Sequence, residues 1–175
     1  FSFFSLGIFI YDDYGISWDE YNERITGFAS LNFIRQILSL EVYPNFPILG
    51  DYIYSEYGVI YNLPMAFLEK TFLTGNLKQF FLFRHFFNFI VYFVSTIFFF
   101  LLLRKRFSKE LSIIGLIFIY LSPRIFADSF YNNKDIIFLS FFVISLYSAI
   151  IFLEEPSYTN TFFLALASSL AIATR

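Results

Sequence analysis

An acidic pair, Asp19 and Glu20, follows the single tryptophan of the chain, Trp18. A carboxylate can accept the proton of a hydroxyl group while that oxygen forms a new bond, which makes a poor nucleophile reactive. Ser17 allows a second interpretation, because Ser-x-x-Glu is the pattern of a capping box, in which both side chains bond to backbone amides at the start of a helix. The pair is therefore a candidate general base, a helix cap, or both.

Three cations, Arg84, Lys134 and Arg175, lie at the ends of apolar segments. Cations held at the depth of lipid headgroups are suited to bind a phosphate group and to stabilise charge that develops on it. Asp135 follows Lys134 in the same polar segment, and Asn132-x-x-Asp135 resembles the start of a helix. Arg84 could instead extend to lipid headgroups, as long basic side chains do at membrane surfaces.

The sequence offers no recognisable metal motif. His85 is the only histidine and has no partner at HExxH spacing, so we do not assign it as a metal ligand. The chain has no cysteine, which excludes disulfides and thiolate metal sites.

Long apolar segments must position these side chains. Residues 80–103 exceed the roughly 20 residues that a helix needs to cross a membrane, and the basic turn Arg104-Lys105-Arg106-Phe107-Ser108-Lys109 follows them. Because Lys and Arg accumulate in short cytoplasmic loops, this turn predicts the inner side, and position 80 then lies at the outer side. The other predicted spans are 1–11 (partial), 111–123, 136–153 and 161–174 (partial).

The predicted fold class is all-α, a polytopic transmembrane helical bundle. A long first outer loop, 12–79, should contain interfacial helices, the first of them with Tyr21, Ile25 and Phe28 on an apolar stripe opposite Glu23. Residues 57–73 are apolar but interrupted by polar groups and proline, and they predict a second interfacial or re-entrant helix. A short outer loop is expected at 124–134.

Composition supports an integral membrane protein. The 175 residues are 58% hydrophobic, with a mean hydropathy of +0.64. The net charge of −2 and the dispersed basic residues give no indication of nucleic-acid binding. The first residue is Phe1 and an apolar run reaches the last, so we expect a fragment of a longer protein, inactive by itself.

Three segments, in this order along the chain, resemble the GT-C glycosyltransferases. They are Trp18-Asp19-Glu20, Phe83-Arg84-His85-Phe86, and the run from Leu121-Ser122-Pro123-Arg124 to Tyr131-Asn132-Asn133-Lys134-Asp135. Within that superfamily the chain is similar to family 39, which includes protein O-mannosyltransferases and the lipid A aminoarabinose transferase. The resemblance covers nearly the whole chain, as the N-terminal part of such an enzyme.

The resemblance implies transfer of a sugar from a polyprenyl-phosphate carrier to a protein or lipid acceptor on the non-cytoplasmic face of a membrane. The acidic position of the family corresponds to Asp19, which would act as general base with Glu20 beside it. Arg84, Lys134 and Arg175 would bind the lipid phosphate, and Asp135 would orient the donor or a cation. Members of the superfamily differ in their use of a divalent metal, so a metal cofactor stays open.

Two other classes of protein fit the same sequence. A transporter or channel segment could use the outer polar groups as a vestibule, and a non-catalytic assembly subunit could carry them for contact with partners. Transporters tend to place charged groups or broken helices near the midplane of the membrane. Residues 89–103 and 138–153 carry no charge, which favours the enzyme.

Overall fold

The computed structural model describes residues 2–73 and 76–174, and helices are the only regular elements in this part of the chain. The prediction of an all-helical membrane protein is thereby confirmed. In chain order the helices are α1 Ser2–Ile10, α2 Trp18–Ile37, the 3₁₀ helix η1 Leu49–Asp51, α3 Asn62–Phe72, α4 Leu77–Arg104, α5 Lys109–Leu121, α6 Pro123–Tyr131, α7 Asp135–Glu154 and α8 Tyr158–Ile172.

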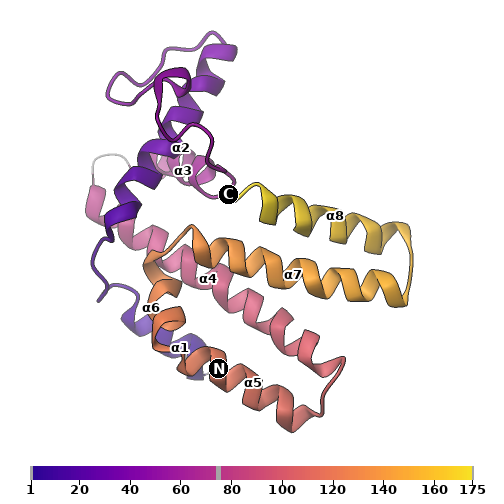
Figure 1. The fold of residues 1–175 in the computed structure, drawn as a ribbon. Coiled ribbons are helices and arrows are strands. Elements are labelled where there is room, and N and C mark those ends of the chain that lie inside the picture. Colours follow the sequence, from indigo (N-terminus) through magenta and orange to yellow (C-terminus); the bar gives the residue numbers. More distant parts are fainter. Residues whose placement is uncertain (1, 74–75, 175) are drawn as a thin grey trace.

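The long helices α4, α7 and α8 run side by side in the bundle of Figure 1. Helices α4 and α7, with 28 and 20 residues, are long and apolar enough to cross a membrane. Helix α8 is apolar but has only 15 residues. Near the predicted cytoplasmic turn, Lys105 Nζ lies 2.6 Å from Glu154 Oε2, which links the ends of α4 and α7.

Helices α5 and α6 form a third candidate crossing, but they are bent by 65° relative to each other. The break is at Ser122, whose backbone is extended, and Pro123 opens α6 in its first turn. Proline suits this position because it lacks the amide hydrogen that an interior helical residue needs. Residues 124–131, which we expected in a loop, are therefore helical.

Helices α2 and α3 form an outer layer at the end of α4 opposite the basic turn (Figure 1). Their backbones approach closely at Gly27, where a Cβ atom would lie only 2.8 Å from the carbonyl carbon of Asn62. Helix α3 has 11 residues, which is too short for a full crossing. The two predicted outer helices exist, and their position in the membrane interface stays a prediction.

The buried face of α2 differs from the expected apolar stripe. Glu23 and Phe28 are buried together, whereas Tyr21 is 54% and Ile37 is 67% exposed. Helical periodicity predicted that the apolar face of α2 would be buried. Much of the face that is buried against α3 and α4 is polar instead. The polar residues buried on α2 are Glu20, Glu23, Thr26, Ser30 and Asn32.

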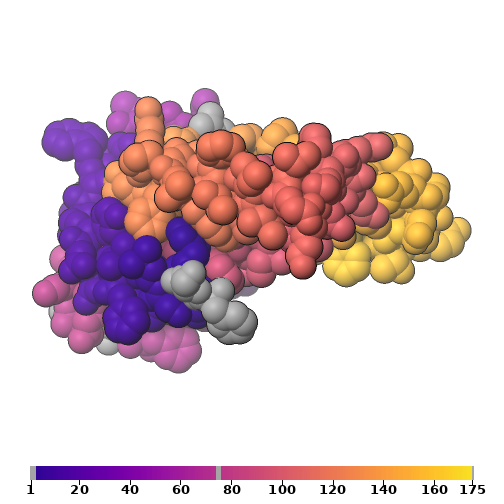
Figure 2. Space-filling view, turned by 90° about the horizontal axis from the view of Figure 1, so that it is seen from below, coloured from indigo at the N-terminus to yellow at the C-terminus, as the bar shows by residue number. Residues whose placement is uncertain are grey.

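The apolar core around the N-terminal part of α4 joins elements that are far apart in the sequence. One cluster contains Tyr61, Met65, Phe80 and Ile137, and a second centres on Phe89 with partners from α1, α6 and α7. Figure 2 shows the resulting elongated shape, in which the N-terminal segments gather at one end and α5 extends toward the other.

Candidate functional site

The site lies in the N-terminal part of α4, beneath the layer formed by α2 and α3. Arg84 and His85 are both 1% exposed. Successive residues on a helix point about 100° apart, so these neighbours reach different partners. Arg84 contacts α3, and His85 contacts the first turn of α2.

Glu20 joins the first turn of α2 to α4. His85 Nε2 lies 3.0 Å from Oε1 and 3.2 Å from Oε2 of Glu20. When Glu20 is ionised its carboxylate only accepts hydrogen bonds, and the imidazole nitrogen is then the donor. The Ser17 amide also donates to Glu20 Oε2, at 2.7 Å, as in a capping box. The Glu20 side chain therefore caps the start of α2 and also contacts His85 on α4.

Asn62 is the second junction of the site. Its Oδ1 accepts a hydrogen bond of 2.9 Å from Arg84 Nη2 and one of 3.4 Å from Asn133 Nδ2. Its Nδ2 donates to Glu23 Oε2 on α2. One amide thus joins a buried carboxylate to a buried guanidinium and connects α2, α3, α4 and the turn before α7. We call this set the outer polar network: Glu20, Glu23, Asn62, Arg84, His85 and Asn133.

Arg84 is enclosed by aromatic rings and has unused donors. Its guanidinium carbon lies 5.2 Å from the ring centre of Tyr61 and 5.5 Å from that of Phe80. The Tyr61 hydroxyl donates to the Arg84 carbonyl at 3.0 Å, and burial raises the pKa of Tyr61, which keeps this donor protonated. Within the described residues, Nε and Nη1 of Arg84 and Nδ1 of His85 have no hydrogen-bond partner.

A separate ion pair holds the outer layer together beside the network. Arg24 on α2 binds Glu69 on α3 through two hydrogen bonds, of 2.8 and 2.6 Å. Both side chains are nearly buried, and the guanidinium carbon lies 5.2 Å from the ring centre of Phe28. This two-point geometry fixes the relative orientation of α2 and α3.

The structure brings together only part of the predicted site. Glu20 and Arg84 belong to the network, whereas Asp19, one residue before Glu20 in the same helical turn, is exposed. Lys134 Nζ lies 3.5 Å from the ring centre of Tyr57. The backbone amide of Asp135 donates to Asn132 Oδ1 at 3.0 Å, as at a helix start, and its exposed carboxylate accepts from Asn132 Nδ2. Arg175 lies outside the described residues.

Sequence reasoning missed two members of the network, Glu23 and Asn62, and it named Asn133 only within a polar loop, without its partner. A signal for Asn62 was present, because an amide inside the apolar segment 57–73 needs a partner if it is buried. Glu23 had been assigned to the polar, outward side of α2, and its spacing of three residues from Glu20 places both on one helix face. His85 was weighed as a metal ligand and set aside, and no pattern in the sequence indicated its contact with Glu20.

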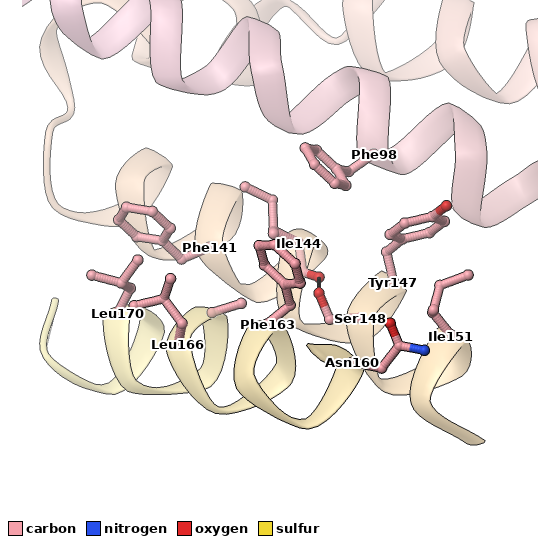
Figure 3. A pocket seen from close by; sticks show the side chains of 11 residues that line it. Phe98, Phe141, Ile144, Tyr147, Ser148, Ile151, Asn160, Phe163, Leu166 and Leu170 are labelled. Atoms are coloured by element: carbon pink, nitrogen blue, oxygen red, sulfur yellow. Dashed lines mark hydrogen bonds between the residues drawn. The ribbon is translucent and has the colours of Figure 1, made fainter. Parts of the chain in front are cut away.

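The described residues contain no group of three or more His, Asp or Glu side chains that could hold a metal ion. A cavity of about 410 Å³ lies elsewhere, between α4, α7 and α8 (Figure 3). Phe98, Tyr147 and Phe163 are typical of its apolar walls, which include no carboxylate and no cation. Phe98 is roughly 20 Å along α4 from Arg84 at 1.5 Å per residue. The buried titratable side chains of the outer polar network therefore lie at the N-terminal end of α4 and not in this cavity.

Comparison with known proteins gives one match. A family model described as dolichyl-phosphate-mannose-protein mannosyltransferase matches residues 71–175, more than half of the chain. No curated protein and no solved structure matches. The matched part includes Arg84, His85 and Asn133, while Glu20, Glu23 and Asn62 precede it.

Proposed function

Because this chain belongs to the dolichyl-phosphate-mannose-protein mannosyltransferase family, we propose that it transfers a sugar from a polyprenyl-phosphate carrier to a protein or lipid acceptor on the non-cytoplasmic face. Family membership establishes the coarser description, a membrane glycosyltransferase with a lipid-linked sugar donor. It also confirms the expected resemblance to GT-C enzymes of family 39, and it favours an enzyme over the transporter and assembly-subunit alternatives.

The orientation follows from charge at the two ends of α4. The turn after α4 carries Arg104, Lys105, Arg106 and Lys109, the kind of short basic loop that stays in the cytoplasm. The outer polar network lies at the opposite end of the same helix. This separation supports an active site that faces away from the cytoplasm.

Asp19 is the proposed general base. Its carboxylate accepts the proton of the acceptor hydroxyl while the acceptor oxygen forms a bond to the anomeric carbon of the sugar. The bond from that carbon to the carrier phosphate breaks, and polyprenyl phosphate leaves with the electron pair. The observation that carries this assignment is the first turn of α2, which exposes Asp19 to an acceptor and anchors Glu20 in the network.

Cations near the same end would stabilise the departing phosphate. Lys134 is half-buried, and its ammonium group lies over the ring of Tyr57. Arg84 is deeper, and its unpaired Nε and Nη1 are donors of the kind that bind phosphate oxygens. We propose phosphate roles for Arg84, Lys134 and Arg175, and a donor-orienting role for Asp135. A metal requirement stays open.

The test measures sugar transfer by the natural gene product in membranes, with radiolabelled polyprenyl-phosphate sugars as donors. Asp19→Asn removes the proton acceptor with little change in size, so we expect activity to fall by about 100-fold or more, within the range that general base catalysis supplies. Asp12→Asn is the matched control, because Asp12 is another exposed carboxylate in the same outer segment. Wild-type transfer by Asp19→Asn would exclude Asp19 as the base.

A further inference from the structure

We propose that His85 is a positioning residue for sugar transfer: it holds Glu20, and through Glu20 it fixes the first turn of α2 and the carboxylate of Asp19. This inference rests on the proposed role of Asp19 as base. It assigns to His85 neither metal binding nor contact with the substrate.

The first turn of α2 has one strong attachment to the bundle on its inner side. Trp18 is 90% and Tyr21 is 54% exposed, and Asp19 is exposed as well. Glu20 is 1% exposed and is the residue of this turn that contacts α4. The position of Asp19 relative to the bundle therefore depends on the contact between Glu20 and His85.

The geometry makes this contact specific. His85 Nε2 lies nearly midway between the two oxygens of Glu20, at 3.0 and 3.2 Å, and the Ser17 amide occupies a further position on Oε2. A buried carboxylate that loses its partner keeps the cost of its desolvation. Without His85, Glu20 would turn toward water, and the capping bond that holds the first turn of α2 would be lost with it.

Misplacement of a catalytic group by about 1 Å can cost on the order of 100-fold in rate. We therefore expect His85→Ala to lower kcat by about 10- to 100-fold, with a change of less than about threefold in KM for the lipid donor. His85→Gln retains an amide donor that can reach Glu20, and it should restore kcat to within about fivefold of the wild type. Val94→Ala, at an exposed position on α4, is the control and should leave kcat unchanged.

A double variant separates positioning from a general loss of structure. If His85 acts through Asp19, then Asp19→Asn combined with His85→Ala should be no less active than Asp19→Asn alone, because the group to be positioned is already absent. Losses that multiply in the double variant would overturn the proposal. So would wild-type kcat in His85→Ala, or a failure of His85→Gln to restore activity. Protein amounts and unfolding temperatures are measured for every variant.

If His85→Ala does not accumulate in membranes, His85→Asn replaces it, because the side-chain amide of asparagine is too short to reach Glu20. The proposal would then be contradicted if His85→Asn had the same kcat as His85→Gln. The two proposals also fail differently. Full activity of Asp19→Asn rejects Asp19 as base, whatever His85 does. An inactive Asp19→Asn together with a fully active His85→Ala leaves the base in place and rejects only the positioning role.

Discussion

Asn62 satisfies two buried groups of opposite charge without bringing them into contact. Its oxygen accepts from Arg84, and its nitrogen donates to Glu23. An aspartate here would repel Glu23, and a lysine would repel Arg84, so a neutral side chain with both a donor and an acceptor is required. The amide of asparagine or glutamine meets this condition, and the shorter one fits between α2 and α4.

Asn62→Ala should lower the free energy of unfolding by about 2 kcal/mol, because a buried carboxylate and a buried guanidinium each lose a partner. Chemical denaturation of the purified protein in detergent measures this loss. Asn45→Ala removes an exposed amide from the same outer segment and should have no measurable effect. Equal stability of the two variants would mean that water replaces Asn62 without cost.

At the scale of elements, the outer layer depends on the close contact of α2 and α3. At Gly27 a Cβ atom would lie 2.8 Å from the carbonyl carbon of Asn62 and 3.2 Å from the Cβ of Ala66. Backbone atoms cannot move aside as a flexible side chain can. The two helices would have to separate, and the contacts that Asn62 makes with Glu23 and Arg84 would lengthen.

Gly27→Ala should therefore destabilise the protein by about 1–3 kcal/mol, the usual cost of overpacking, although alanine favours helices more than glycine does. Gly15→Ala is the control, since no atom lies within 4 Å of a Cβ built there. Thermal unfolding of both variants, followed by circular dichroism, gives the comparison. A Gly27→Ala protein as stable as the wild type would show that α3 can shift without loss.

The sequence predicted the positions of the helices better than it predicted which side chains contact one another. Helix α4 was clear because an uninterrupted apolar run and a basic turn are local signals. The buried face of α2 was misjudged, because the partners of Glu20 and Glu23 lie 65 and 39 residues away in the chain, and helical periodicity gives no information on such distant contacts. For the same reason the sequence placed Asn133 in a polar loop but could not predict its bond to Asn62, 71 residues away.

At the scale of the whole molecule, the proposed topology places the outer layer and the turn after α4 on opposite sides of the membrane. The chain has no cysteine, so single cysteines can report the side directly. Asn45→Cys should react with a membrane-impermeant maleimide added outside, and Phe107→Cys should react only after permeabilisation. Phe107 is 53% exposed, which makes its cysteine accessible. Labelling of both positions from one side would reject the topology.

The outer layer is also attached to the far end of the chain, since the Ile60 amide donates to the Ala173 carbonyl at 3.2 Å. This bond has a consequence for synthesis. At about 5–20 residues per second, the ribosome needs on the order of 10 s to make the roughly 100 residues that separate these partners. During that interval α2 and α3 have emerged, but the end of α8 that helps to hold them does not yet exist. The nascent protein must therefore keep the buried charges of α2 and α3 satisfied before the bond between Ile60 and Ala173 can form.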